Sequence, residues 1–282
     1  NIQPLKPGEE KYAISFAIPM NTKGLKVMSR RSYEESATSS FDYPLSSRFD
    51  ENDALVYCDD VKVPWERVFI YKDTDTARGQ FQDTYAHYMQ NYQAMIRLMV
   101  KMQFQIGVAR RMCETIGTVG MPPVAEKLGH MAAQAAMVEG LVYGMESGGG
   151  EFNGYYVPDR NLMYTAQVLT QQLYPEFITS MRELAGGGLI MLPSSAEDFA
   201  DPELNKYINA TQKSAIGSAE EKVKLMKLAW DSIGSEFASR HTQYEMFYAG
   251  AQFVTRGHAM RTYDWERSSN LVDSILDKYS LS

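Results

Sequence analysis

The chain has 282 residues, 44% of them hydrophobic, which is enough for one large domain or two ordinary ones. Its net charge of -7 argues against a nucleic-acid-binding protein, because such proteins usually present a basic face. No apolar run reaches the roughly 18 residues of a membrane span, and no signal peptide is visible. The two cysteines, Cys58 and Cys113, fit a reduced cytosolic protein, and the four histidines lack the spacing of a metal site.

Residues 1–75 are predicted to form strands. Alternating apolar side chains indicate one strand face near the start, at Tyr12, Ile14, Phe16 and Ile18. Short apolar runs among polar residues indicate further strands of a half-buried sheet, at Ala54, Val56, Val61 and Val63. Pro64 ends the last run, because proline cannot donate a hydrogen bond to a neighbouring strand. About four strands fit before Tyr71 and would leave an uncovered edge, so we expect the second half of a β-domain within a longer protein.

A polar, serine-rich loop lies between two of these strands, over residues 30–40. An ordinary solvent-exposed loop is the simplest interpretation of its composition. The alternative is a mobile lid, since long loops on rigid scaffolds often carry function.

The remaining residues, 76–282, are predicted to form a helical bundle. From about Gln80 the apolar residues recur at steps of three and four, which predicts a buried helix as far as Thr115. Further helices are expected at 124–147, 160–184, 218–237 and from about 252 to 279. Ser218 and Glu221 have the spacing of a capping box, and the 17 methionines are interpreted as filling of the helical core. The predicted fold class is α+β and mostly α, with a partial β-domain followed by the bundle.

No self-sufficient catalytic signature is present in the sequence. The triplet Gly186, Gly187 and Gly188 follows a helix rather than a strand, so it is not the fingerprint of dinucleotide-binding folds. Its glycines let the backbone approach either another helix or a ligand phosphate, and packing is the simpler interpretation. His241, beside Arg240, is predicted to follow a helix, where a lone histidine is more often structural than catalytic.

Four longer segments carry a family resemblance. They read YPLSSRFDENDA at 43–54, VPWERVFIYKD at 63–73, GGLIMLPSS at 187–195 and WDSIGSEFASRHTQYEMFYAGAQ at 230–252. The chain resembles the large, oxygenase component of 4-hydroxyphenylacetate 3-monooxygenase and its relatives, in which these segments occur in the same order. The resemblance implies the acyl-CoA dehydrogenase fold, in which an N-terminal helical domain and a central β-domain precede a C-terminal bundle. It also implies a homotetramer, and it places most phenol-contacting positions before Asn1.

The resemblance implies a flavin contact at Tyr248, Ala249, Gly250 and Ala251. In the dehydrogenase relatives the matching Tyr-Glu-Gly-Thr segment packs against the flavin, and its glutamate can remove a substrate proton. Gly250 keeps the close backbone approach, whereas Ala249 cannot accept a proton. This departure favours an oxygenase over a dehydrogenase.

The chemistry that the resemblance implies requires two proteins. A separate reductase uses NADH to supply reduced FAD (FADH2), which reacts with O2 to form a C4a-hydroperoxide. That intermediate transfers a hydroxyl group to the carbon ortho to a phenol and gives a catechol, while the protein positions the phenol and excludes water. The serine-rich loop, residues 32–42, would shield the hydroperoxide as a lid. The glycine triplet at 186–188 resembles the family's contact to the flavin of a neighbouring subunit.

Two other functions stay open. An enzyme like 4-hydroxybutanoyl-CoA dehydratase, a distant relative on the same fold, needs cysteine and histidine ligands for an iron–sulfur cluster. Only Cys58 and Cys113 are present, and neither has a histidine at suitable spacing, although preceding residues could supply ligands. The second alternative is a non-catalytic helical assembly module that has lost its flavin.

Overall fold

The structure is a computed structural model that describes residues 5–281. Its N-terminal part contains two separate pairs of short antiparallel strands. β1 (Ile14–Phe16) pairs with β4 (Val68–Tyr71), and β2 (Leu25–Ser29) pairs with β3 (Ala54–Cys58). Four strands are present, as expected, but Val61 and Val63, predicted to lie in a strand, belong to an irregular segment between β3 and β4. The half-buried sheet is also wrong, because every residue of β3 is exposed. A ribbon of two strands cannot cover its own faces.

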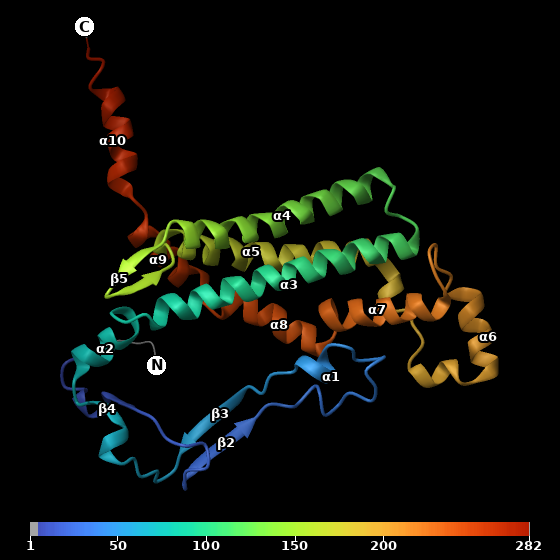
Figure 1. Cartoon of the computed structure of the whole chain (residues 1–282), viewed down its shortest axis with the longest axis horizontal. Coiled ribbons are helices and arrows are strands. Elements are labelled where there is room, and N and C mark those ends of the chain that lie inside the picture. The colour runs from blue at the N-terminus through green and yellow to red at the C-terminus, as the bar shows by residue number, and fades with distance from the viewer. Residues whose placement is uncertain (1–4, 282) are drawn as a thin grey trace.

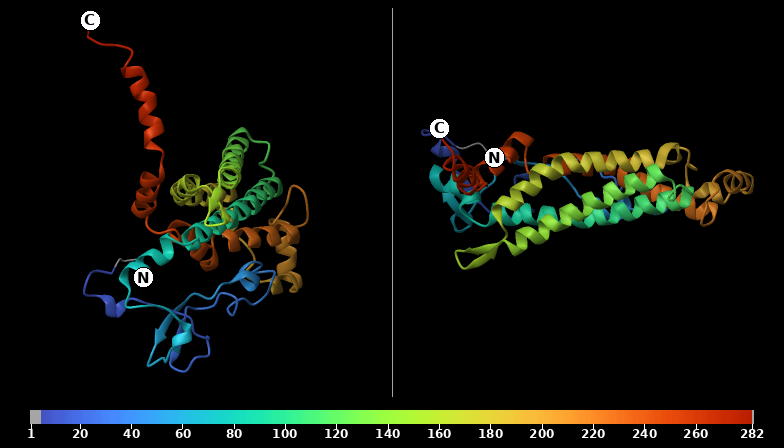
Figure 2. Two further views of the ribbon diagram at one scale, coloured as in Figure 1. Left: turned by 60° about the vertical axis from the view of Figure 1, so that its left-hand side comes forward. Right: turned by 90° about the horizontal axis from the view of Figure 1, so that it is seen from above.

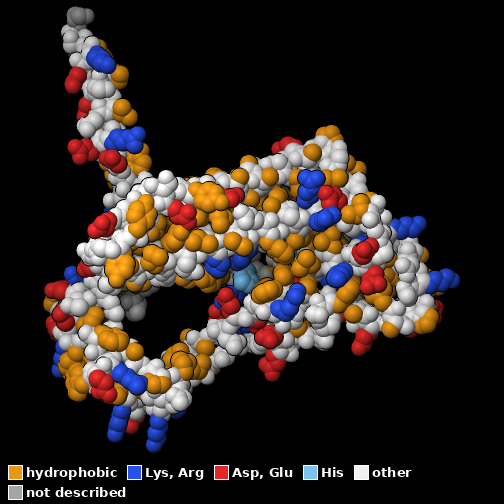
Figure 3. Space-filling view, in the orientation of Figure 1, with side chains coloured by type: hydrophobic (Ala, Val, Ile, Leu, Met, Phe, Trp, Pro, Cys, Tyr) orange, Lys and Arg blue, Asp and Glu red, His pale blue; other side chains and the backbone are white. Residues whose placement is uncertain are grey.

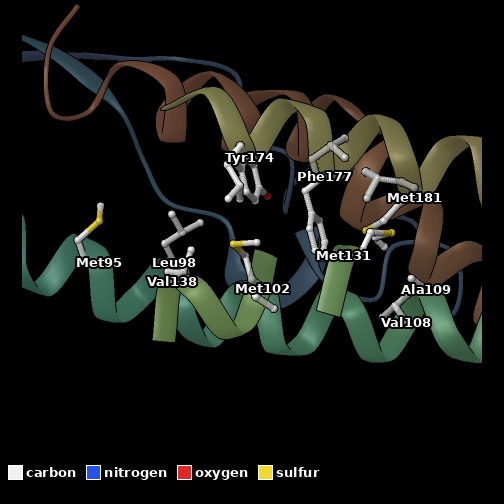
Figure 4. Close-up of a cluster of buried hydrophobic side chains, with 14 of the residues drawn as sticks. Met95, Leu98, Met102, Val108, Ala109, Met131, Val138, Tyr174, Phe177 and Met181 are labelled. Carbon is white, nitrogen blue, oxygen red and sulfur yellow. The ribbon is translucent and has the colours of Figure 1, made fainter. Parts of the chain in front are cut away.

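The rest of the chain is mostly helical, as Figures 1 and 2 show. The long helices of the bundle are α3 (Ala86–Ile116), α4 (Pro122–Ser147), α5 (Arg160–Ala185) and α7 (Ala219–Ile233). Their apolar faces meet in one core, where Leu98, Met102, Val138 and Phe177 are each at most 1% exposed (Figure 4). Methionine fills this core as predicted, because its unbranched side chain adapts to irregular gaps.

The helix predicted at 218–237 is divided into two. Its capping box is confirmed, since Ser218 and Glu221 each bond the other's backbone. The first helix, α7, ends before Gly234, and α8 (Glu236–Phe247) begins after Ser235, whose side chain caps it. A Cβ at position 234 would lie 2.4 Å from the Trp230 ring, so the turn requires glycine there.

Other boundaries differ from prediction for similar local reasons. The start expected at Gln80 is wrong, because Asp73 caps a separate short helix and α3 begins only after a break. The last predicted helix is two helices, since Asp264 caps the second. The shorter α-helices are α1 (Ser46–Phe49), α2 (Thr74–Gln82), α6 (Pro202–Thr211), α9 (Gln252–Thr262) and α10 (Trp265–Leu276). A hairpin of β5 (Gly150–Phe152) and β6 (Tyr155–Val157) was not anticipated, and neither was α6.

Helix α10 extends away from the bundle (Figures 1 and 2). None of its residues is buried, and its exposed side chains include Leu271, Val272 and Ile275. Trp265 Nε1 donates to the carbonyl oxygen of Met260 at 2.8 Å, which ties the start of α10 to α9. Among residues 5–281, no helix has both the length and the apolar character needed to cross a membrane.

Candidate functional site

The junction between α8 and α9 contains Tyr248, Ala249, Gly250 and Ala251, the segment predicted to contact a flavin. Figure 3 shows an opening between the strand segment and the bundle, and α3 and α8 run along one side of it (Figure 1). Ala249 has no group that could accept a proton. The junction can therefore offer its backbone and neighbouring side chains to a ligand, but it offers no base at that position.

A buried glutamine fixes the shape of this junction. Gln171 of α5, which is 2% exposed, donates from Nε2 to the carbonyl oxygens of Met246 at 2.9 Å and Gly250 at 2.6 Å. Its Oε1 accepts a hydrogen bond from Thr255 Oγ1 at 2.8 Å. Gly250 has φ +105°, which residues with a Cβ rarely adopt. Gln171 was not predicted as a site residue, because its sequence signal is merely a polar residue in the middle of a helix expected to be buried.

Aromatic side chains lie next to the turn. Tyr248 stacks on Tyr244 with ring centroids 4.6 Å apart, and its hydroxyl accepts from Gln93 Nε2 at 3.0 Å. The guanidinium of Arg97 lies over the Tyr244 ring at 4.4 Å. A Cβ on Gly250 would meet nothing closer than 3.7 Å, so the backbone of the turn is open to close approach. The turn thus combines an accessible backbone with flat aromatic side chains.

An ion cluster adjoins these rings, between α3 and α8. Glu245, whose side chain is 3% exposed, pairs with Arg97 and with Lys101 Nζ at 2.5 Å. Lys101 Nζ also lies 3.1 Å from His241 Nδ1. Burial lowers the pKa of Lys101, and the Glu245 carboxylate opposes that change. Burial, and after it the positive charges of Lys101 and Arg240, lower the pKa of His241 to about 3, so this ring is neutral near pH 7.

His241 therefore differs in position from its prediction. It lies within α8 rather than after a helix, and its ring also packs edge-on against Phe237 at 4.4 Å. The partners Arg97 and Lys101 come from α3, more than a hundred residues earlier, so no local pattern could have revealed the cluster.

The serine-rich loop is held by carboxylates near both ends, and one of them ties it to the bundle. The Asp50 carboxylate accepts from the backbone N–H of Tyr33 at 2.7 Å and pairs with Arg30 at 2.6 Å. Asp42, which is buried, pairs with Lys227 Nζ of α7 at 2.8 Å. Residues 34–36, in the middle of the loop, are exposed. A cavity of about 460 Å³ lies where the loop meets α8, lined by Arg30, Arg31, Tyr33, Gly234, Glu236, Ser239 and Arg240.

The second predicted contact, Gly186 to Gly188, lies at the far end of α5 from the hairpin. Gly186 ends the helix with φ +56° and ψ −149°, a conformation essentially restricted to glycine. A Cβ on Gly186 or Gly187 would meet nothing within 4 Å, whereas one on Gly188 would lie 3.2 Å from Met226 Cε. About 15 residues of helix separate Gln171 from Gly186 and span roughly 22 Å. One chain therefore does not bring the two predicted segments together.

The class of protein is known from its sequence: the chain is a member of the 4-hydroxyphenylacetate 3-hydroxylase family. The profile of that family's C-terminal region matches residues 77–277, and the profile of its N-terminal region matches residues 1–70. The chain is homologous to the oxygenase components of FAD-using aromatic monooxygenases.

The chain is similar in sequence to several bacterial oxygenase components. The 4-hydroxyphenylacetate 3-monooxygenase oxygenase component of Pseudomonas aeruginosa is 37% identical over 255 residues, covering 89% of this chain and 49% of that protein. The oxygenase component of the same name from Escherichia coli is 36% identical, covering 95% of this chain and 53% of that protein. The 4-nitrophenol 2-monooxygenase oxygenase component of a Rhodococcus species is 35% identical, covering 90% and 50%. The chain thus spans about half the length of these relatives.

Solved structures agree with the fold class predicted from the sequence. The crystal structure of the oxygenase component of 4-hydroxyphenylacetate 3-monooxygenase with FAD and 4-hydroxyphenylacetate has a TM-score of 0.90 and 33% identity, covering 97% of this chain and 57% of that one. A 4-hydroxybutyryl-CoA dehydratase from N. maritimus has a TM-score of 0.85, covering 99% of this chain and 56% of that one. Its identity is 19%, so that likeness shows a common fold alone. Within residues 5–281, Cys58 is exposed, Cys113 is buried, and no three or more His, Cys, Asp or Glu side chains gather as metal ligands.

Proposed function

We propose that the protein is the oxygenase component of a two-component, FADH2-dependent aromatic monooxygenase that converts a phenol of the 4-hydroxyphenylacetate type to a catechol. The observation that carries this proposal is the turn at Gly250, which has an open backbone and, at Ala249, an alanine in place of an acid. Such a turn suits a flavin enzyme that needs no proton-abstracting base at this position. Membership of the hydroxylase family supports the same reaction class.

In this proposal the chain's own residues bind and orient the flavin. The Gly250 turn approaches the ring system, Gln171 holds that turn in place, and the stacked pair Tyr244 and Tyr248 borders it. Reduced FAD, when bound, activates O2 and delivers one oxygen atom to the ring carbon ortho to the phenol hydroxyl, while the other leaves as water. A separate flavin reductase supplies the reduced FAD. The loop at 32–42 excludes water from the site.

The assembly is also part of the proposal. Residues 1–75 belong to the β-domain, residues 76–282 form the bundle, and four copies assemble as a homotetramer. Gly186 and Gly187, whose backbone is open, contact the flavin of a neighbouring subunit. The roughly 22 Å of helix between them and the Gly250 turn supports a contact across subunits rather than within one chain.

Product analysis tests the reaction. The protein that contains this chain is mixed without oxygen with photoreduced FAD, and then with O2 and either 4-hydroxyphenylacetate or 4-nitrophenol. We expect a catechol, identified by chromatography against standards. Hydrogen peroxide alone with every phenol would contradict the proposal, and failure to bind reduced FAD would favour the assembly module without flavin.

A further inference from the structure

A second cluster of ionisable side chains lies where α3, α5 and α9 meet. It consists of His87 at the start of α3, Arg160 and Tyr164 at the start of α5, and His258 and Arg261 of α9. His87 is 8% exposed and Tyr164 is 1% exposed, while Arg160 and Arg261 are exposed. The cluster thus has a buried aromatic floor and a cationic rim that solvent can reach.

Direct contacts connect the members. The Tyr164 hydroxyl lies 2.9 Å from His87 Nδ1. The Tyr164 ring stacks on His258 with centroids 4.8 Å apart and an interplanar angle of 11°. Arg261 Nη2 lies 2.8 Å from His258 Nδ1, and the Arg160 guanidinium lies 5.9 Å from the centre of the Tyr164 ring. Five side chains from three helices therefore converge on one place.

The cluster carries positive charge without a matching carboxylate. Among the described residues, neither Arg160 nor Arg261 has a carboxylate oxygen within the 4.0 Å of an ion pair, although the chain is acidic overall. The neighbouring Asp159 instead caps α5, accepting from the backbone N–H of Leu162 at 2.7 Å. Like charges at close range are unfavourable unless an anion balances them.

The pKa values of both histidines in the cluster are lowered. Burial, followed by the charges of His258 and Arg160, lowers the pKa of His87 to about 4. Burial and then Arg261 and Arg160 also lower the pKa of His258. No carboxylate opposes these effects at either ring, so a bound anion would raise both pKa values.

We propose that Arg160, Arg261 and His258 form a binding site for an anionic oxygen group, a phosphate or a carboxylate, at the solvent-facing rim of this cluster. The planar guanidinium groups suit bidentate binding of either anion. The site lies on the same side of α5 as the Gly250 turn, since Tyr164 precedes Gln171 by two helical turns, roughly 10 Å. A phosphate of a dinucleotide and the carboxylate of an aromatic acid are the two candidate sources. The site does not depend on flavin chemistry.

Histidine NMR tests the site on the purified chain. The ring protons of the four histidines are titrated with pH, alone and with inorganic phosphate, 4-hydroxyphenylacetate or its neutral analogue 4-(2-hydroxyethyl)phenol. The spectrum of His258→Gln identifies the His258 signals. We expect phosphate, 4-hydroxyphenylacetate or both to raise the pKa of His87 and His258, and to bind more tightly at about pH 6 than at about pH 8. A response to phosphate alone assigns a phosphate site, and a response to 4-hydroxyphenylacetate alone assigns a carboxylate site.

Matched variants complete the test. Arg160→Gln and Arg261→Gln, both at exposed positions, should each weaken binding of the active probe about tenfold. Arg256→Gln is the control, because Arg256 lies in α9 like Arg261 and, among the residues that the structure describes, its side chain bonds only to Gln252. The proposal is overturned if neither anion shifts the two histidines, if the neutral analogue shifts them equally, or if Arg256→Gln weakens binding as much as the other two.

Discussion

At the scale of single residues, Gln171 connects the bundle to the α8–α9 junction through all three of its polar contacts. The carbonyl oxygens that it binds belong to the last turn of α8 and to the junction, and Thr255 satisfies its own amide oxygen. A buried amide left without partners costs about 1–3 kcal/mol, so the side chain and the turn hold each other in one arrangement. The position of Gly250 is therefore set by α5 as well as by its own conformation.

Gly250→Leu tests the role of this turn. The substitution forces a branched side chain into φ +105° and fills the open space above the backbone. We expect FAD binding, measured by fluorescence titration, to weaken at least about tenfold. Gly154→Leu is the control, because Gly154 also has a positive φ and open space but lies in the β5–β6 hairpin. Equal affinities in the two variants would remove the turn from the site.

The ring of His241 should make the free energy of unfolding depend on pH. Its pKa is about 3 in the folded state against an ordinary 6.5, so the unfolded chain binds the extra proton. The stabilisation is complete above about pH 6.5 and is lost as the pH falls toward 3, by about 4–5 kcal/mol at most. In His241→Gln the decline of unfolding free energy between these pH values should be shallower, as measured by urea denaturation.

The control variant for the pH slope of the unfolding free energy is His130→Gln. The side chain of His130 is 55% exposed and contacts Glu176 at the surface, so this substitution removes a histidine without touching the ion cluster of Glu245. A slope in His241→Gln that matches the slope of the unsubstituted protein would show that the ring is not held neutral by its surroundings.

At the scale of elements, sequence periodicity predicted the bounds of a helix best where that helix has one continuous apolar stripe. The helix expected at 160–184 is α5 almost to the residue, and the capping box of Ser218 was recognised because both partners are local. The break at Gly234 was missed because it depends on the Trp230 ring, whose position periodicity does not report. The contacts of the site were missed for the same reason, since Gln171 and Gly250 are 79 residues apart.

Shortening the serine-rich loop should uncouple FADH2 consumption from hydroxylation of the phenol. Removing residues 34–38 leaves the anchors at Asp42 and Asp50 in place and shortens only the middle of the loop. In the proposed monooxygenase, we expect more hydrogen peroxide and less catechol for each FADH2 consumed, because water reaches the site. The control carries alanine at Glu35 and Ser36 in a loop of unchanged length. If the deletion leaves the ratio of peroxide to catechol unchanged, the loop is not a lid.

At the scale of the whole molecule, helix α10 has few neighbours within its own chain. Leu271 and Ile275 are one helical turn apart, and both are more than half exposed. A helix of 12 residues is marginal in water by itself. In the proposed homotetramer, a second copy covers this apolar face, which would explain why an extended helix keeps it.

Assembly is measurable by sedimentation velocity. We expect the protein to sediment as a tetramer, and the double variant Leu271→Asp with Ile275→Asp to sediment as a smaller species, because two buried charges oppose association. The control, Glu266→Gln with Asp273→Asn, changes polar residues of the same helix and should leave the tetramer intact. A tetramer in the double variant would exclude this helix face from the interface.

The methionine-rich core affects how the protein responds to oxidation. Seven of the 17 methionines are 0% exposed, and oxidation of any of them would place a polar sulfoxide inside the bundle. Met20 and Met191 are both 72% exposed, and a sulfoxide there disturbs no packing. Peroxide released by an oxygenase would thus oxidise the exposed methionines first. The packing of the helices would be lost only after the oxidant had reached the buried methionines.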